Sequence, residues 1–232
     1  GVQTCALPIC RRQTWLRSAT EAMHRRGFSC VAIEADVSSE QDAARAVDEA
    51  ARALGGLDIL VNNAGMMKPG TIEDASLADW RAAFTVNGEG VFLGCKAAIA
   101  AMKSRPADLP AAAIVNVAST MAIRAQPMHA VYSATKAAVQ MLSKSAAVHC
   151  GRAGYRIRIN CVLPGAIDTE LLRGNINPGQ TEDDYFTTLK ARYPTGRIGS
   201  PLDIANGVVF LVSDEADFMT GADLLLDGGS TA

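Results

Sequence analysis

The alternation of short apolar runs with longer helical segments constrains this chain more than any other feature of its sequence. Runs with the length and composition of strands lie at 31–36, 58–64, 112–119, 156–163 and 222–227. The segments between them are long enough to cross back over a sheet. Because parallel strands need such crossovers, the pattern predicts an α/β fold built on a doubly wound parallel sheet.

Helix start and stop signals punctuate the segments between these runs. Ser76 followed by Asp79 is a capping-box pattern and predicts a long helix that reaches about Lys103. The stretch Ser200-Pro201-Leu202-Asp203 combines a cap, a proline in the first turn and an acid near the positive end of the helix dipole. Helices are also expected after Ser38-Ser39, with a stop at Gly55-Gly56, and over 129–150. The continuously apolar run at 58–64 predicts a strand buried on both faces.

Length and charge narrow the class of protein. The 232 residues suit a single domain, and 49% of them are hydrophobic, so the chain can bury a full core. The net charge of −2 comes with no basic run interleaved with aromatics, which argues against a nucleic-acid partner. The longest apolar candidate for a membrane span, 91–102, is short and carries Lys96, so we expect a core helix there and no membrane partner.

Cysteine and histidine positions give no sign of a metal site. The six cysteines contain no CxxC pair, and the three histidines are scattered. We therefore expect no metal, and we interpret the cysteines as small buried thiols in the reducing cytoplasm. His129 is expected to begin a helix, with contact to a substrate as the alternative.

Polar residues gather where the predicted strands end. Asn62-Asn63, Ser119 and Pro164-Gly165 each follow a different strand, and ligands of doubly wound sheets bind at the carboxyl ends of the strands. The polar segment from about 170 to 199, with glycine and proline at intervals, follows the strand that carries Pro164. It is interpreted as a mobile substrate lid, with a surface excursion of no role as the alternative.

A tyrosine and a lysine share one face of the predicted helix over 129–150. Tyr132 and Lys136 are four residues apart, which is helical spacing. Tyrosine has an unperturbed pKa of about 10, and a nearby ammonium favours its phenolate, so Tyr132 becomes a usable proton donor or acceptor. Ser119 ends the preceding strand, where its hydroxyl could bond a reacting carbonyl oxygen.

Several motifs then carry a resemblance to a known family. The segment Tyr132-Ser133-Ala134-Thr135-Lys136, with Ser119 upstream, resembles the active-site signature of the short-chain dehydrogenase/reductase family. Asn62-Asn63-Ala64-Gly65 resembles its NNAG element, and Asn87 matches the helix asparagine of its catalytic tetrad. Pro164 to Thr169 matches its PG motif, and Asp36-Val37 matches the acidic dipeptide that contacts adenine. The similarity runs from about Arg11 to the end.

The resemblance implies a Rossmann-like oxidoreductase that transfers a hydride between NAD or NADP and a carbonyl or secondary alcohol. Tyr132 is then the acid/base, Lys136 lowers its pKa and binds the nicotinamide ribose, and Ser119 orients the carbonyl. Asn87 kinks its helix and holds a water. The implied cofactor-binding residues are Asp36, Val37, Asn63, Ala64, Gly65, Tyr132, Lys136, Pro164, Gly165, Ile167 and Thr169.

Most of these residues also have a purely structural interpretation. Asn87 could be a buried helix amide, Thr169 could cap the following helix, and Asp36 could end a strand without any ligand. Arg11 and Arg12 could favour the 2′-phosphate of NADP or simply be solvated, so the choice between NAD and NADP stays open.

The sequence lacks one element that the family leads us to expect. A nicotinamide fold of this kind carries a glycine-rich turn that cradles the pyrophosphate, in this family Thr-Gly-x-x-x-Gly-x-Gly, and no such run occurs in the chain. We expect the domain, 11–232, to lack its first strand and helix and most of its second strand. The strand at 58–64 then has an open edge, and cofactor binding is weak or absent.

The first ten residues fit poorly with the strand expected before Arg11. Pro8 removes a backbone donor there. Residues 1–10 resemble a translated adapter sequence and are expected to be a leader foreign to the domain, with a divergent native start as the alternative.

Within the family, a 3-oxoacyl-carrier-protein reductase-like role and a sugar or secondary-alcohol dehydrogenase role remain open. A hypothesis from another class is a non-catalytic Rossmann binding protein, or a fragment made inactive by the missing turn. A homodimer or homotetramer is expected for the complete protein.

Overall fold

A computed structural model describes residues 5–6, 8–176 and 179–232. Within these residues, its main sheet has the strand order β5-β6-β7-β8, and every pairing in it is parallel. The strands are β5 (Ile59–Asn62), β6 (Ala112–Val117), β7 (Ile157–Pro164) and β8 (Asp223–Leu226). The α/β fold with a parallel sheet predicted from the sequence is therefore confirmed.

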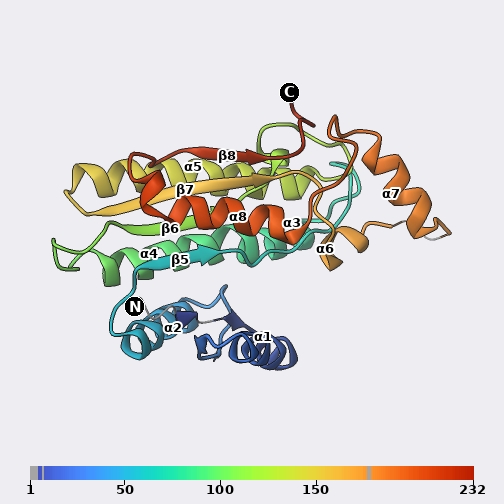
Figure 1. The fold of residues 1–232 in the computed structure, drawn as a ribbon. Coiled ribbons are helices and arrows are strands. Elements are labelled where there is room, and N and C mark those ends of the chain that lie inside the picture. The colour runs from blue at the N-terminus through green and yellow to red at the C-terminus, as the bar shows by residue number, and fades with distance from the viewer. Residues whose placement is uncertain (1–4, 7, 177–178) are drawn as a thin grey trace.

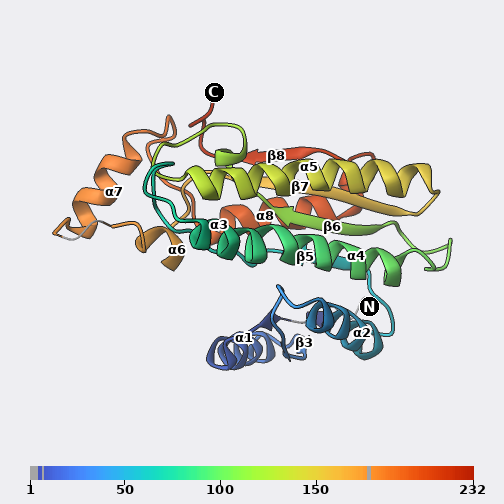
Figure 2. The ribbon, with the colours of Figure 1, turned by 180° about the vertical axis from the view of Figure 1, so that it is seen from behind.

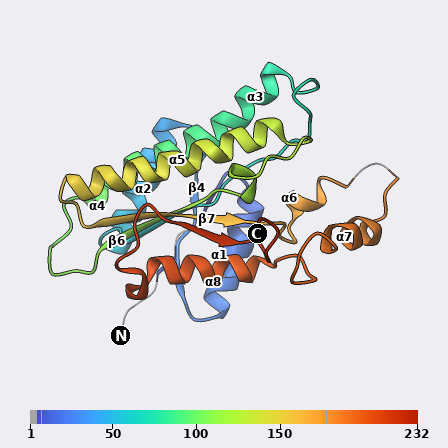
Figure 3. The same cartoon turned by 90° about the horizontal axis from the view of Figure 1, so that it is seen from above.

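Helices cover both faces of this sheet (Figure 3). The helices α4 (Gly90–Met102) and α5 (Ala130–Arg152) pack on one face, and α8 (Pro201–Val212) packs on the other. Strand residues of β6 and β7 such as Ile114 and Ile159 are fully buried beneath α4 and α5, while Val115 and Val162 are buried with Leu211 of α8. The central strands are apolar on both faces because both faces are covered.

The predicted helix caps form as the sequence indicates. Ser76 and Ser200 both make capping boxes, at the starts of α3 (Leu77–Ala83) and α8. Ser39 accepts a hydrogen bond from Asp42 N at 3.2 Å and begins α2 (Glu40–Leu54), which ends at Gly55 with a φ of 75°. These features depend on residues a few positions apart, so the sequence alone contains them.

The helix predicted to run unbroken from Ser76 to about Lys103 is wrong in its middle. A π-helical turn, η1 (Phe84–Glu89), separates α3 from α4 and contains Asn87. The side chain of Asn87 bonds to the backbone of Met66, far away in the chain. The widened turn accompanies this long-range contact, and such turns are frequent at functional sites.

The N-terminal residues form short strands apart from the main sheet. β1 (Cys5–Ala6) pairs with β3 (Ser29–Cys30), and β2 (Ile9–Cys10) pairs with β4 (Ile33–Glu34), all in parallel. Of the strand predicted at 31–36, only β4 forms, because its partner β2 pairs with just two of its residues, and β3 lies before the predicted run. Residues 1–4 and 7 of the expected leader lie outside the described residues.

The helices α1 (Gln13–Arg25) and α2 complete this N-terminal region, which lies beyond β5 at the edge of the sheet (Figures 1 and 2). It is joined to the rest of the protein through α4. Val47 of α2 belongs to the core beneath α4, and a Cβ built at Gly90 would lie 3.1 Å from Val37 Cγ2. This close approach fixes the segment after β4 against α4.

The outer edge of β5 pairs with no strand among the described residues. Ile59 is 46% exposed and Val61 is 39% exposed. The expectation of burial on both faces is therefore wrong for β5, since no neighbouring strand and no described helix covers these side chains. The open edge expected for this strand is present.

The segment predicted to be a lid contains two short helices, α6 (Glu170–Arg173) and α7 (Glu182–Lys190). Its residues 177–178 lie outside the described residues. Helix α7 projects away from the sheet (Figure 1). Two single turns, η2 (Thr120–Ala122) and η3 (Asp214–Ala216), complete the described elements. Among the described helices, none combines the length and the apolar character needed to cross a membrane.

Gly94 of α4 faces Asn62 of β5, and a Cβ at Gly94 would overlap Asn62 Oδ1. Asn62 resists displacement because its Nδ2 donates a hydrogen bond to Asn116 Oδ1 at 2.8 Å. We expect Gly94→Ala to lower the free energy of unfolding by about 1–3 kcal/mol, the usual cost of overpacking. Urea denaturation monitored by circular dichroism measures this change.

Gly151→Ala, near the end of α5, is the matched control because a Cβ built at Gly151 has no heavy atom within 4 Å. It should leave stability unchanged or raise it by up to ~1 kcal/mol, since alanine favours the helix. Equal destabilisation by both substitutions would contradict a packing constraint at Gly94.

Candidate active site

Tyr132 and Ser119 meet at the carboxyl end of β6. Tyr132 lies in the first turn of α5 and is buried, and Ser119 follows β6 in extended conformation. Ser119 Oγ accepts a hydrogen bond from Met121 N at 3.1 Å, which holds the hydroxyl in place. Burial raises the pKa of Tyr132 to about 12, while a side-chain hydrogen bond with Ser119 acts in the opposite direction. The phenol is therefore protonated at neutral pH.

Lys136 lies one helical turn after Tyr132 and is also buried. Its Nζ donates a hydrogen bond to Val117 O at 2.7 Å and lies 5.6 Å from the centroid of the Tyr132 ring. Burial lowers the pKa of Lys136 to about 8. The contribution that opposes burial at Tyr132 comes from Ser119, so the lowering of the Tyr132 pKa by Lys136 stays a prediction.

Asn87 connects the loop after β5 with α5. It is fully buried; its Oδ1 accepts a hydrogen bond from Met66 N at 2.8 Å, and its Nδ2 donates to Met66 O at 2.9 Å and to Thr135 Oγ1 at 3.0 Å. A Cβ built at Gly65 would lie 3.4 Å from Asn87 Oδ1 and 3.6 Å from Lys136 Nζ. Gly65, the last residue of the Asn63–Gly65 loop, therefore lies directly beside two of the predicted catalytic residues.

The Pro164–Thr169 segment lies at the end of β7, next to the strand that leads to Ser119. Gly165 N donates to Leu226 O at 3.0 Å, which fixes the turn to β8. Ile167 pairs with Gly199 across the base of the lid segment. Thr169 accepts a hydrogen bond from Leu172 N at 3.3 Å and caps α6, so its capping role is confirmed and its cofactor contact stays a prediction.

Asp36 lies just after β4 with its carboxylate already bonded. It accepts hydrogen bonds from Ser38 N at 3.0 Å and from Ser38 Oγ at 2.6 Å, and Arg11 Nη1 lies 3.1 Å away. These contacts, the Ser38 hydroxyl first, lower the pKa of Asp36 despite some burial. Arg11 thus pairs with Asp36, and Val37 packs against Gly90. Both the structural and the adenine-binding interpretations of Asp36 fit this arrangement.

Sequence reasoning missed several polar groups around the site. Thr135 links Asn87 to the Tyr132 carbonyl, and its place inside the Tyr132–Lys136 motif was the available signal. Tyr193 Oη accepts a hydrogen bond from Ala166 N at 2.6 Å, and the lid sequence gives no hint of it. His129 Nε2 and Ser133 Oγ are buried without a partner among the described residues.

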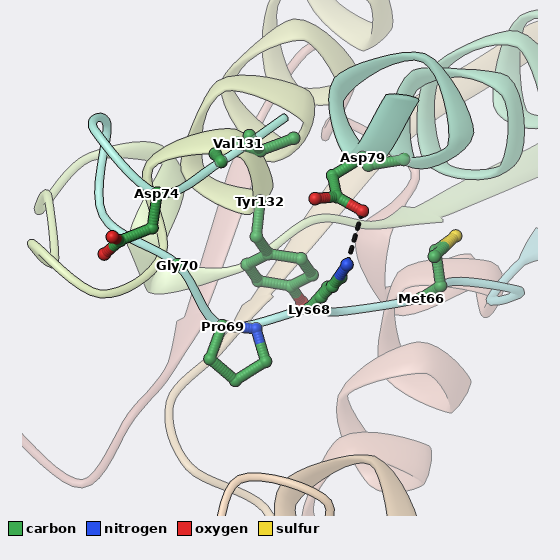
Figure 4. A pocket seen from close by; sticks show the side chains of 10 residues that line it. Met66, Lys68, Pro69, Gly70, Asp74, Asp79, Val131 and Tyr132 are labelled. Carbon is green, nitrogen blue, oxygen red and sulfur yellow. Dashed lines mark hydrogen bonds and ion pairs between the residues drawn. The ribbon is translucent and has the colours of Figure 1, made fainter. Parts of the chain in front are cut away.

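A small cavity of about 90 Å³ opens beside Tyr132 (Figure 4). An ion pair of Lys68 Nζ with Asp79 Oδ1, at 2.6 Å, stands on one side of it. The rest of its wall is mostly apolar or backbone, from Met66, Pro69, Gly70, Ala75, Ala83 and Val131, with Asp74 at the rim. The cavity can receive a small part of a ligand next to the phenol.

Comparisons with known proteins agree with the motifs. Residues 3–231 match the family model described as Enoyl-(Acyl carrier protein) reductase. The chain is 37% identical to the 2,5-dichloro-2,5-cyclohexadiene-1,4-diol dehydrogenase LinX of Sphingobium indicum, over 88% of this chain and 76% of the relative. It is 38% identical to a 3-alpha-(or 20-beta)-hydroxysteroid dehydrogenase of Mycobacterium bovis, over 86% of this chain and 70% of the relative.

A third relative is the NADP-dependent (R)-specific alcohol dehydrogenase of Lentilactobacillus kefiri. The identity is 36%, over 86% of this chain and 76% of that protein. The similarity therefore extends over most of both chains in each of these comparisons.

Lys136→Met removes the buried ammonium and keeps a long side chain. Because burial lowers the pKa of Lys136 from 10.5 to about 8, the unfolded chain binds this proton more tightly than the folded chain. The wild type therefore gains stability as the pH rises from about 8 to about 10.5, and the variant does not. We expect the Tm of Lys136→Met relative to wild type to fall across this window, measured by thermal unfolding at several pH values.

The exposed Lys103 provides the control Lys103→Met for loss of a positive charge. If the Tm difference between Lys136→Met and wild type does not change with pH, that result would contradict the lowered pKa of the buried Lys136 ammonium.

Proposed function

Because the chain belongs to the short-chain dehydrogenase/reductase family, we propose that it moves a hydride between NAD(P) and a carbonyl or secondary alcohol, with Tyr132 as the acid/base. At the level of reaction class, the protein is an NAD(P)-dependent dehydrogenase. The proposal that Tyr132 is the acid/base is supported by one observation: Tyr132, Ser119 and Lys136 lie together at the carboxyl end of β6.

The protonated phenol suits the direction of carbonyl reduction. Ser119 and Tyr132 hydroxyls both donate toward the substrate oxygen, and Tyr132 delivers its proton as that oxygen gains negative charge. A pKa of about 12 keeps Tyr132 protonated until then. In the oxidation direction Tyr132 takes the alcohol proton, and the Lys136 ammonium lowers the cost of the resulting negative charge. The nicotinamide, when bound, supplies or accepts the hydride.

The residues present fit one part of the cofactor better than the rest. Gly65 lies beside Asn87 and Lys136, so the loop after β5 brings its backbone next to the lysine that we propose binds the nicotinamide ribose. Pro164, Gly165, Ile167 and Thr169 lie at the end of the adjacent strand β7. For the pyrophosphate, the sequence contains no glycine-rich turn. We therefore propose weak cofactor affinity for this chain.

A neutral secondary alcohol or ketone is the proposed substrate class. The wall of the cavity beside Tyr132 combines apolar side chains with polar groups, and its lysine, Lys68, is paired with Asp79, so the described residues of the cavity offer no free cation to an anionic substrate. A 3-oxoacyl-carrier-protein substrate and a sugar are the alternatives within the reaction class. A cytoplasmic location is proposed because the buried thiols Cys95, Cys150 and Cys161 are free.

Association of two copies is proposed from apolar side chains on the outer helices. Phe92 of α4 and Met141 and Val148 of α5 are each about half exposed or more. Met141 and Val148 are two helical turns apart and lie on the same side of α5. Exposed apolar faces of this kind favour a homodimer, or a homotetramer if a second face contributes.

A non-catalytic Rossmann binding protein is the second candidate. The open edge of β5 and the missing glycine-rich turn favour it. The two candidates differ in what Tyr132 does.

Tyr132→Phe removes the proposed proton donor and keeps the ring. We expect kcat for reduction of a small ketone, assayed at millimolar NADPH or NADH, to fall by about 10²–10⁴-fold, because that is the usual contribution of a positioned acid. Cofactor affinity should stay close to that of the wild type. Tyr155→Phe, between the end of α5 and the start of β7, lies away from the carboxyl ends of the strands; it is the control and should retain turnover. Equal turnover in wild type and Tyr132→Phe would contradict the acid/base role.

Titration with NADH and NADPH, followed by their fluorescence, tests the affinity of this chain. We expect no saturation in the micromolar range, because no glycine-rich turn is available to bind the pyrophosphate. Tight, micromolar binding would contradict this proposal and leave the acid/base proposal intact.

A further inference from the structure

A row of polar side chains crosses the main sheet, one from each strand. Asn62 of β5 pairs in register with Asn116 of β6, Asn116 with Cys161 of β7, and Cys161 with Asp223 of β8. Residues directly opposite in neighbouring strands point to the same face. This polar row therefore faces the side of the sheet that α4 and α5 cover.

Asn116 is the centre of the polar row, and its amide is fully used. It is completely buried; its Oδ1 accepts from Asn62 Nδ2 at 2.8 Å, and its Nδ2 donates to Ser143 Oγ of α5 at 2.8 Å. The Cys95 thiol of α4 lies 3.5 Å from Nδ2 and 3.6 Å from Oδ1. One side chain thus connects β5, β6, α4 and α5.

Ser143 is equally well bonded. Its Oγ accepts from Asn116 and from the Cys161 thiol at 3.1 Å, and donates to Val139 O at 2.7 Å. At the far end of the polar row, Asp223 Oδ2 accepts from Gln140 Nε2 at 2.7 Å and lies 2.6 Å from Lys144 Nζ. The inward side of α5 is therefore attached to the row at successive turns.

These attachments lie on the same helix as the proposed acid/base. Ser143 is two helical turns after Lys136 on the same side of α5. Asn116 is on the strand that leads directly to Ser119. The bond between Asn116 and Ser143 thus joins the element that carries Tyr132 and Lys136 to the element that carries Ser119.

Apolar packing alone would fix this register poorly. The core between α5 and the sheet is made of side chains such as Val139, Ile114 and Ile159, whose attraction is not directional. A hydrogen bond between buried groups is directional, and shifting α5 would leave both the Asn116 amide and the Ser143 hydroxyl without partners in a dry interior. The polar row therefore selects one placement of α5.

We propose that Asn116 is a positioning residue that acts through Ser143 to set Tyr132 and Lys136 at the correct distance from Ser119. It contacts neither substrate nor cofactor in this arrangement. The inference rests on the proposed function for its effect on turnover, and on the described hydrogen bonds for its effect on geometry.

Asn160 offers a matched control. It is as buried as Asn116 and lies on the neighbouring strand β7, but its Nδ2 donates to Met219 O at 2.8 Å and its Oδ1 accepts from Ala222 N at 3.0 Å. Asn160→Ala therefore removes an equally buried amide that secures the approach to β8 instead of α5. Both Asn160→Ala and Asn116→Ala are expected to lower Tm.

The decisive measurement is the ¹³Cζ NMR signal of Tyr132 in protein labelled at tyrosine, since that signal reports the surroundings of the phenol and needs no cofactor. Tyr132→Phe assigns it among the four tyrosines. We expect Asn116→Ala to shift or broaden the Tyr132 signal and Asn160→Ala to leave it unchanged. Ser143→Ala, a smaller change that also serves if Asn116→Ala does not fold, should reproduce the shift.

The double variant Asn116→Ala with Ser143→Ala should move the Tyr132 signal no further than Asn116→Ala alone, because Asn116→Ala already removes the bond to Ser143. Where turnover is measurable, kcat should fall by about tenfold or more with little change in KM. An unchanged Tyr132 signal in Ser143→Ala, or equal shifts in Asn116→Ala and Asn160→Ala, would overturn the positioning role. Retained turnover in Tyr132→Phe would instead overturn the proposed function and leave this result standing.

Discussion

The placement of α5 against β6 is the constraint on which the rest of this protein depends. The helix carries Tyr132 and Lys136, the strand leads to Ser119, and Lys136 Nζ bonds the last carbonyl of the strand at Val117. A buried ammonium is costly unless it is bonded, so this contact is formed at a definite position along the strand. The geometry of the site follows from where the helix lies on the sheet.

The same burial has opposite effects on the two ionisable groups. It raises the pKa of Tyr132 to about 12 and lowers that of Lys136 to about 8. Both shifts disfavour charge, so the site is held in a state where the phenol keeps its proton and the ammonium is easily neutralised. Burial of these two groups therefore lowers the stability of the fold at the site where proton transfer is proposed. Such shifts of pKa are common where ionisable groups are buried in active sites.

Predictions from the sequence succeeded where the determining residues are close together in the chain. The capping boxes at Ser76 and Ser200 and the shared face of Tyr132 and Lys136 depend on spacings of three or four residues. The π-helical turn at Asn87 escaped prediction because its cause is a bond to Met66, on another element. The exposure of Ile59 depends on which strands are present beside β5, which the run 58–64 does not encode.

The polar row could not be predicted from the sequence for a related reason. The partners of a buried asparagine in an apolar strand depend on the register of all four strands. That register also shows which strands hold the proposed site. The row ties Ser119, Tyr132 and Lys136 to β6, β7 and β8, none of which uses the open edge of β5. Asn62 joins the Asn63–Gly65 loop to this frame from one side only. The geometry of the proposed acid/base site therefore rests mainly on β6, β7 and β8, and β5 contributes through the bond of Asn62 to Asn116 and the bond of Met66, in the loop after β5, to Asn87.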